Sequence, residues 1–336
     1  MWFYLLFLLI IALCLNAYAK TKKNLYNNLL VFIVTIVAIF RYNVGYDYQT
    51  YYRIIINENH ELIYLLFSPL SALFAEIAIY FHSPQLLFVL FGVPTYILIF
   101  STLRKFSFAY SISVLMFICL CYFNTLSIIR QALAVAITFY GYRYVRERKF
   151  FCYMLLVVLA TLFHTSAVFS VIIYWLPRIQ FNKLIILLIS AIILRPVIFF
   201  AMNKLGFYDN YLSEDIHIEG GSLIIIFILF MYMFCLYIWL KQRTIDNRGL
   251  INIVSVGVIC YAFFGPHLGG RASLYFEIYF YLLLPNLTSK LATSHKKAMM
   301  LVASYSFVCF FILYMWIPFI KGNISSYVPY KLFFLQ

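Results

Sequence analysis

Long apolar segments separated by short polar ones fill the chain, the pattern typical of helices that cross a membrane. About 20 apolar residues span the hydrocarbon core of a bilayer. Segments of this or nearly this length predict spanning helices at about residues 2–19, 27–40, 84–103, 107–124, 128–145, 184–205, 222–240, 250–267, 271–287 and 298–320. The predicted fold class is an all-α, polytopic integral membrane protein with about 11–12 membrane segments, including short broken helices.

Composition supports this class. Hydrophobic residues make up 65% of the 336 residues and charged residues only 11%, with a mean hydropathy of +0.94. No water-soluble core could bury so much apolar surface. The net charge of +14 comes from lysines and arginines in short loops between apolar segments, where they set topology, so no nucleic-acid partner is expected. The seven cysteines lie within apolar segments without metal-ligand spacing, which predicts neither disulfides nor a metal site.

Residues 124–149 fix the orientation of the chain. They predict one helix that has Arg130 and Gln131 near its start and a basic cluster at its end, formed by Arg143, Arg146, Arg148 and Lys149. Because basic loops stay preferentially in the cytoplasm, Arg130 and Gln131 are predicted near the outer face of the membrane. An unpaired arginine within lipid is costly, so Arg130 is either an anchor at the membrane edge or a functional residue.

Two apolar segments do not fit as single spans. If residues 62–81 crossed the membrane, the basic loops that follow would lie on the wrong side, so we expect an interfacial helix within an outer-face loop of residues 41–83. Residues 151–176 are expected to form two short segments that meet at residues 163–166, with His164 toward the outer face. A break at membrane depth is tolerated only beside a cavity or under protein cover, so it indicates a site.

The first span, residues 2–19, is expected to remain uncleaved, because no positive region precedes it and lysines follow at once. No internal repeat or soluble domain is visible. Residues 1–336 are therefore expected to form a single membrane domain.

Polar residues that topology does not require gather at the predicted outer face. They are Arg41, Asp47, Arg53, Glu61, Arg130, Gln131, His164, His267, Arg271, Tyr327 and Tyr330. This set suits a substrate with an anionic head and a hydroxyl-rich body, such as a sugar linked to a lipid diphosphate. Arginine grips phosphate oxygens and stabilises a leaving diphosphate, a carboxylate or neutral histidine takes a proton from an attacking hydroxyl, and tyrosines pack against sugar rings.

Each candidate also has a purely structural explanation. Arg130 is equally suited to anchor a helix at the interface, and Gln131 to form a hydrogen bond between helices. Asp47 fits a turn, His164 fits a packed position at a helix break, and Arg271 fits a cap after two glycines. Their shared side of the membrane, and no single residue, favours a functional site.

Several short motifs carry a resemblance. In chain order they are Arg41-x-x-Val-Gly45-x-Asp47-Tyr48-x-x-Tyr51, Ile129-Arg130-Gln131-Ala132-Leu133-Ala134, Leu162-Phe163-His164-x-Ser166-Ala167, Arg271 before an aromatic stretch, and Val328-Pro329-Tyr330. The ordered set resembles the EpsG branch of the Wzy-type polysaccharide polymerases and covers most of the chain. The chain departs from many polymerases of the wider class in its small outer loops.

The resemblance implies a GT-C-like architecture and a glycosyltransferase of a bacterial cytoplasmic membrane, with its active site facing outside. Such an enzyme polymerises repeat units carried on undecaprenyl diphosphate, for O-antigen, capsule or exopolysaccharide. The predicted catalytic residues are Asp47, His164 and Arg130. The predicted substrate-binding residues are Arg41, Tyr48, Tyr51, Gln131, His267, Arg271 and Tyr330.

In the expected reaction, a hydroxyl of a new repeat unit attacks the anomeric carbon of the growing glycan, and the lipid diphosphate leaves. Arg130 and Arg271 would hold the diphosphate, with Asp47 or His164 as the base. The scheme requires no metal or other cofactor. The expected partners are the undecaprenyl-diphosphate-linked donor and acceptor, the bilayer, and a chain-length regulator and flippase of the same pathway.

Other classes remain open. A flippase or transporter of lipid-linked oligosaccharides would also need arginines in a membrane cavity, although repeated halves and charges throughout the membrane depth would be expected. A membrane acyltransferase that modifies surface polysaccharide would use histidine and arginine, but its site should connect to a cytoplasmic acyl donor. A purely structural channel subunit is the simplest alternative.

Overall fold

A computed structural model describes residues 2–204, 221–242, 245–289, 295–311 and 327–335. Regular structure in these residues is helical except for two strands of two residues each. The chain divides into two compact units. The first unit is Met1–Ala167 with Thr288–Gln336, and the second is Val168–Leu287.

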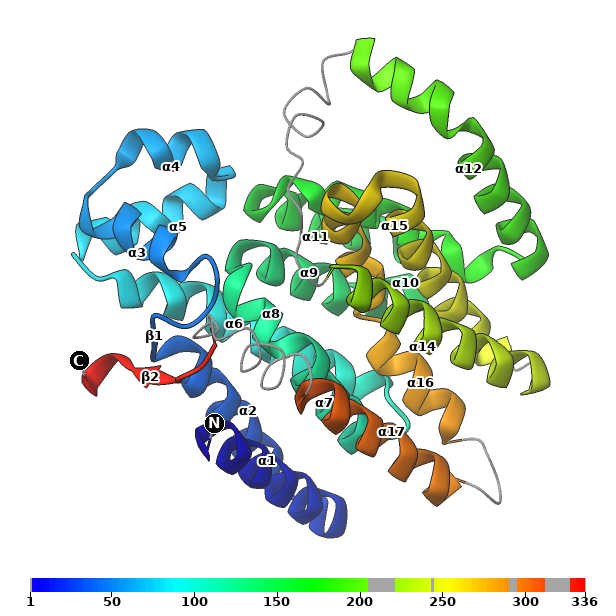
Figure 1. Cartoon of the computed structure of the whole chain (residues 1–336), viewed down its shortest axis with the longest axis horizontal. Coiled ribbons are helices and arrows are strands. Elements are labelled where there is room, and N and C mark those ends of the chain that lie inside the picture. The colour runs from blue at the N-terminus through cyan, green and yellow to red at the C-terminus, as the bar shows by residue number, and fades with distance from the viewer. Residues whose placement is uncertain (1, 205–220, 243–244, 290–294, 312–326, 336) are drawn as a thin grey trace. The chain divides into compact units, whose positions relative to one another are not determined.

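The first unit contains both short and long helices (Figure 1). Its elements are α1 (Trp2–Thr21), α2 (Asn24–Ile39), β1 (Arg41–Tyr42), α3 (Tyr48–Ile56), α4 (His60–Leu66), α5 (Pro69–Tyr80), α6 (Pro84–Phe106), α7 (Tyr110–Phe117), the π-helix η1 (Ile118–Tyr122), α8 (Phe123–Ser127), α9 (Ile129–Tyr140), α10 (Tyr142–Arg146), α11 (Phe150–Phe163), α17 (His295–Phe311), β2 (Lys331–Leu332) and η5 (Phe333–Leu335).

Longer helices dominate the second unit. Its elements are most of the 3₁₀ helix η2 (Thr165–Tyr174), η3 (Leu176–Arg178), α12 (Phe181–Lys204), α14 (Gly221–Gln242), α15 (Ile245–Glu277) and all but the last residue of α16 (Phe280–Thr288).

Three stretches of the described residues are long and apolar enough to cross a membrane by length and composition. They are Trp2–Thr21, Pro84–Phe106 and Tyr110–Ser127. At 1.5 Å per residue, Pro84–Phe106 measures about 35 Å, which exceeds the ~30 Å hydrocarbon core of a bilayer. These helices confirm the predicted all-α membrane protein.

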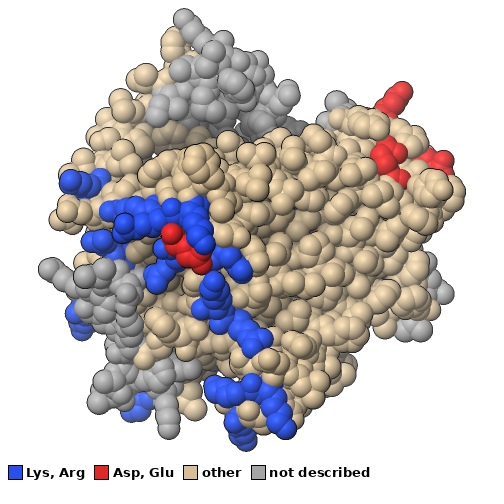
Figure 2. Space-filling model, turned by 180° about the vertical axis from the view of Figure 1, so that it is seen from behind, with Lys and Arg blue, Asp and Glu red and all other residues tan. Residues whose placement is uncertain are grey.

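The helices of the first unit run alternately between two ends. At one of them, the basic end, Arg104 in the last turn of α6 donates to Asn24 at the start of α2 at 2.5 Å. Lys105 lies 3.9 Å from Glu147 in the connection between α10 and α11. Figure 2 shows lysine and arginine side chains gathered on one part of the surface, with other acidic side chains far from this gathering. The alternation agrees with the order of segments predicted for this part of the chain.

Helix α9 lies against α6 and α11 in the core of the first unit. Every residue from Gln131 to Phe139 is buried, so the helix is enclosed on all sides. Such a helix must be apolar nearly all round. The small side chains of Ala132, Ala134 and Ala136 let the neighbouring helices approach closely.

Residues 41–83, which we call the cap, form three short helices at the end opposite the basic end. The 12 residues of α5 reach about 18 Å, too short to cross the hydrocarbon core. Ser71 in α5 donates to the carbonyl of Phe163 at the end of α11, at 2.7 Å. That this helix lies at the membrane interface without crossing stays a prediction.

Two imidazole–carboxylate pairs fasten the exposed side of the cap. His60 lies 2.9 Å from Glu76, and His82 lies 3.0 Å from Glu58. The hydrogen bond to Glu76 raises the pKa of His60. Because the pKa is raised on folding, the stability that this pair contributes is fully present below the ordinary pKa of histidine, in the range where a carboxylate is ionised, and is lost as the pH rises through the raised pKa.

The predicted break at residues 163–166 is confirmed. Helix α11 ends at Phe163, and His164 has extended backbone angles of φ −155° and ψ 120°. The chain then continues as η2 from Thr165. The break therefore exposes backbone groups of His164 and its neighbours to side-chain partners.

Helix α15 reverses direction within its own length. A Cβ atom on Gly257 would lie 2.8 Å from the Cβ of Phe276, whereas these positions would be about 28 Å apart in a straight helix. A Cβ atom on Gly269 would overlap the carbonyl oxygen of Cys260. The two legs correspond to the predicted segments 250–267 and 271–287, and only glycine fits where they touch.

We predict that Ala134→Leu destabilises the first unit. Ala134 is fully buried in α9, and forcing a larger side chain into a packed interface costs about 1–3 kcal/mol. Thermal unfolding of the detergent-purified protein should show a lower midpoint. Ala19→Leu, at an exposed position near the end of α1, is the matched control and should leave the midpoint unchanged. Equal midpoints for the two variants would contradict the tight packing of α9.

Candidate functional site

Arg41 is buried between the ends of two helices. Its side chain is 2% exposed, and its Nη1 donates to the carbonyl of Ala38 near the end of α2. Its Nη2 donates to the carbonyl of Leu126 near the end of α8, at 2.7 Å, and its Nε donates to the carbonyl of Val44 at 2.9 Å. The last carbonyls of a helix lack partners within the helix and carry partial negative charge. Arg41 therefore caps two helices at once.

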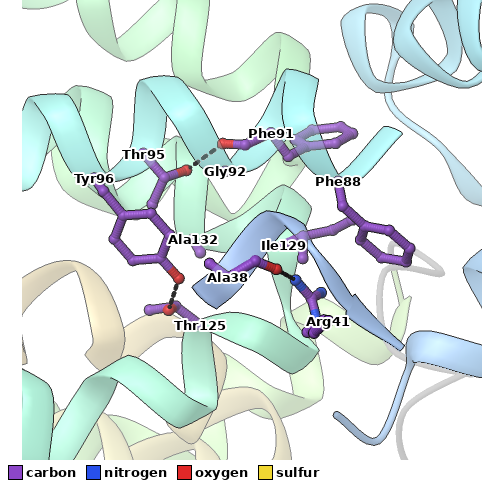
Figure 3. A pocket seen from close by; sticks show the side chains of 10 residues that line it. All are labelled: Ala38, Arg41, Phe88, Phe91, Gly92, Thr95, Tyr96, Thr125, Ile129 and Ala132. Carbon is purple, nitrogen blue, oxygen red and sulfur yellow. Dashed lines mark hydrogen bonds between the residues drawn. The ribbon is translucent and has the colours of Figure 1, made fainter. Parts of the chain in front are cut away.

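Aromatic rings and a small cavity complete the surroundings of Arg41 (Figure 3). The guanidinium carbon lies 4.4 Å from the centre of the Phe88 ring, close enough for a cation–π interaction. Tyr96 and Thr125 share a hydrogen bond of 2.9 Å on the far side of the cavity. The free space, about 10 Å³, holds about one water molecule. No carboxylate of the described residues pairs with Arg41.

Gly45 allows the loop after Arg41 to lie against the end of α8. Its φ of +107° is unfavourable for other residues, and a Cβ atom would lie 3.0 Å from the carbonyl oxygen of Leu126. The next residue, Tyr46, donates its backbone N–H to the hydroxyl of Ser127 at 2.9 Å. The Arg41 motif of the sequence is thus a closely packed turn.

The side chains of Tyr48 and Tyr330 are also held by contacts within the protein. Tyr48 is 0% exposed and stacks on Phe88 with ring centres 4.8 Å apart. The hydroxyl of Tyr330 donates to the carbonyl of Val37 at 2.7 Å, and its ring stacks on Phe3 at 3.9 Å. Strand β2, which follows Tyr330, pairs antiparallel with β1. Tyr48 thus holds the cap against α6, and Tyr330 holds the C-terminal residues against α1 and α2.

Arg130 is placed differently from Arg41. It lies in the first turn of α9 and is partly exposed. Its Nη1 donates to the carbonyl of Leu66 at 2.8 Å, and its guanidinium carbon lies 4.3 Å from the centre of the Phe67 ring. Its Nε lies 3.4 Å from the hydroxyl of Tyr51. Arg130 is thereby oriented by the cap while part of its surface stays open.

The start of α9 adds positive partial charge beside Arg130. Ile128, at the N-cap position, has no side-chain acceptor for the first backbone N–H groups of the helix. The N-terminus of a helix favours anions through these N–H groups and through the helix dipole. Arg130 and the start of α9 together suit a phosphate group.

Gln131 connects α9 to the break after α11. Its Nε2 lies 3.5 Å from the Oγ of Ser166, and this Oγ lies 2.7 Å from the Nδ1 of His164. Gln131 is buried, whereas His164 is partly exposed. The sequence-predicted residues Gln131 and His164 are therefore brought together through Ser166.

Asp47 occupies the N-cap position of α3 and is partly exposed. Burial raises the pKa of Tyr51, Arg130 lowers it in part, and the charge of Asp47 raises it further. Burial also raises the pKa of Tyr327, and the charge of Asp47 adds to this effect. Asp47 therefore lies near the same tyrosine that contacts Arg130. We call Asp47, Tyr51, Phe67, Arg130, Gln131, His164 and Ser166 the Arg130 cluster.

Two predicted residues lie in the second unit. Arg271 is exposed on the second leg of α15. The backbone of His267 belongs to α15, but its side chain lies outside the described residues. Their part in a site stays a prediction.

Phe67 and the carbonyl of Leu66 were missed by the sequence reasoning. Helix α4 ends at Leu66, and Ser68-Pro69 follows after the single residue Phe67. The residue before a proline avoids helical angles, so the helix must end there and leave terminal carbonyls without partners. The proline could have indicated that a carbonyl at the end of α4 is free to accept a hydrogen bond from an arginine. It could not have indicated which arginine donates.

We predict that Arg41→Met prevents stable folding, whereas Arg130→Met does not. Loss of the Arg41 guanidinium leaves three buried carbonyls unpaired, at about 1–3 kcal/mol each. Arg130 is partly exposed, so water can replace its bonds. Size-exclusion profiles and thermal midpoints of the purified variants should separate the two. A well-folded Arg41→Met protein would contradict the capping role.

In a comparison with protein families, the chain matches the model of the EpsG family over residues 24–332. No curated protein and no solved structure matches the chain, so the GT-C-like architecture stays a prediction. The matched range contains β1, the whole cap, α9 and the break at His164. The chain therefore belongs to the EpsG family.

Proposed function

We propose that the chain polymerises glycan repeat units carried on undecaprenyl diphosphate, at the outer face of a bacterial cytoplasmic membrane. The EpsG family consists of polysaccharide-polymerase-like glycosyltransferases, and its match covers nearly the whole chain. The observation that carries the proposal is the partly exposed Arg130 at the uncapped start of α9, with His164 held through Ser166 and Gln131 beside the same turn.

The donor diphosphate would bind at Arg130. Two of its guanidinium nitrogens already face Leu66 and Tyr51 of the cap, which fixes the direction of the planar fork. Phosphate oxygens accept paired hydrogen bonds from such a fork. Negative charge grows on the diphosphate as the bond to the sugar breaks, so the arginine and the helix dipole stabilise the transition state more than the ground state.

The transfer itself forms one bond and breaks one. The acceptor hydroxyl oxygen bonds to the anomeric carbon of the donor glycan, and the bond from that carbon to the diphosphate oxygen breaks. The lipid diphosphate leaves with the electron pair. The hydroxyl proton passes to a base of the Arg130 cluster, Asp47 or His164.

His164 is suited to this task in one tautomer. If its Nδ1–H donates to the Oγ of Ser166, its Nε2 carries a lone pair that accepts a proton. Gln131 would hold Ser166 in place by donating to the same Oγ. Ser166 and Gln131 are then positioning residues for the base.

Asp47 is the alternative base. Its place at the start of α3 sets it near Tyr51, whose hydroxyl contacts Arg130. A carboxylate there would accept the acceptor proton next to the bound diphosphate.

We predict that Arg130→Ala abolishes polymerisation but leaves a folded protein in the membrane. A deletion strain complemented with wild type should show a ladder of glycan lengths on a gel, whereas Arg130→Ala should leave single repeat units on their acceptor. Arg148→Ala, which removes an exposed arginine at the basic end, is the matched control and should restore the ladder.

Other outcomes of this experiment would contradict the proposal. If deletion prevents any repeat unit from reaching the surface, the chain is a flippase or transporter. If the ladder is unchanged but its chemistry differs, the chain modifies a polymer that another enzyme builds. A full ladder with Arg130→Ala would exclude Arg130 as the diphosphate ligand.

We predict that His164→Gln lowers the polymerisation rate more than Asp47→Asn. Loss of a general base costs about 10²–10⁴-fold in rate, and Ser166 holds His164 in a fixed position. The rate should be measured with purified protein and lipid-linked repeat units. Ser166→Ala should reduce the rate less than His164→Gln, because it disturbs only the position of the imidazole. The reverse order for His164→Gln and Asp47→Asn would make Asp47 the base.

A further inference from the structure

A polar hollow opens on the cap, lined by α3, α4 and the connection between them. Its volume is about 280 Å³, near the lower limit of the roughly 300–1,000 Å³ of small-molecule sites. Its lining residues are Gln49, Thr50, Arg53, Ile54, Asn57, Asn59 and Leu62. None of these residues belongs to the Arg130 cluster, so the hollow is a separate feature of the cap.

Several polar side chains in the hollow have no hydrogen bond or ion pair with another described residue. Thr50, Arg53 and Asn57 are exposed, and among the described residues their side chains make no hydrogen bond or ion pair. Gln49 is held by a 2.6 Å hydrogen bond to Asn43, and the Oδ1 of Asn59 accepts from the N–H of Leu62 at 3.0 Å. Two amides are thus fixed in place, while a hydroxyl, a guanidinium and a third amide remain available.

This set of groups selects a hydroxyl-rich ligand. Amides and a hydroxyl both donate and accept hydrogen bonds, as sugar hydroxyls do. No carboxylate lines the hollow, which disfavours the binding of a metal cation. Its single arginine would neutralise only a small part of the negative charge of a diphosphate. Ile54 and Leu62 supply an apolar wall for the C–H face of a sugar ring.

The hollow and the Arg130 cluster lie on opposite faces of one short helix. Tyr48 and Tyr51 are buried on the inner face of α3, whereas Thr50 and Arg53 are exposed on its outer face. A helix with its side chains is about 10–12 Å thick, a distance that a short glycan spans. A glycan attached to a diphosphate at Arg130 could therefore extend around α3 into the hollow.

We propose that this hollow binds a segment of the substrate glycan, remote from the bond that is formed. The inference rests on the proposed function for the identity of the glycan. Binding there would hold the sugar chain while its lipid end reacts, so the hollow would influence affinity and product length, while Arg130 and the base carry out the transfer.

Binding should be measured with purified protein and the lipid-free oligosaccharide released by mild acid from the lipid-linked repeat units of the host strain. The double variant Arg53→Ala/Asn57→Ala should bind about ten-fold or more weakly by titration calorimetry, because two hydrogen-bonding side chains are lost. Thr50→Trp, which fills the hollow, should weaken binding similarly. Lys331→Ala removes an exposed charge from β2 without touching the hollow and should bind as wild type does.

The two proposals fail in different ways. Unchanged affinity in both hollow variants, or no binding by the wild type, would overturn the subsite. Arg130→Ala should still bind the lipid-free oligosaccharide, and its loss of binding would place the glycan at the Arg130 cluster instead. In the deletion strain, the hollow variants should make shorter chains. Failure of the wild type to restore the ladder would overturn the proposed function, whatever the binding result.

Discussion

The buried guanidinium of Arg41 is the interaction on which the arrangement of the first unit depends. Burying a charge costs several kcal/mol unless partners replace its water. Here the partners are backbone carbonyls near the ends of α2 and α8 and the face of Phe88, with no carboxylate of the described residues involved. Each helix end in turn lacks donors of its own. The guanidinium supplies donors to the carbonyls at both helix ends, and these carbonyls replace the water that it loses on burial. These bonds fix the position at which the cap begins and the position at which α9 starts.

From that fixed point the Arg130 cluster follows. The end of α8 is held by Arg41, and α9 begins directly after Ile128, so the first turn of α9 is placed against the cap. The cap supplies the Leu66 carbonyl and the Phe67 ring to Arg130, while the break after α11 supplies His164 and Ser166 to Gln131. One buried arginine thus supports another that stays partly open, as the proposed binding of a lipid diphosphate requires.

The cap has two faces with different chemistry because α3 is amphipathic. Its inner residues, such as Tyr48 and Tyr51, pack toward Arg41 and Arg130, and its outer residues, such as Thr50 and Arg53, line the polar hollow. Membrane helices gain little from burial against one another, since lipid is equally apolar. The specific contacts in this unit therefore come from hydrogen bonds, cation–π contacts and close glycine approaches, as at Gly45 and Gly92.

The sequence by itself determined the fold class, the break at His164 and the family, because apolar length, charge bias and ordered motifs are local properties of the chain. It also placed Arg41 and Arg130 in one set of candidate site residues. An arginine near a helix end gives the same sequence pattern whether it caps helix ends or binds a substrate. Only the tertiary structure separated them. Arg41 is enclosed by carbonyls from residues far apart in the chain, and Arg130 is left partly open, a difference that depends on which helix ends meet in space.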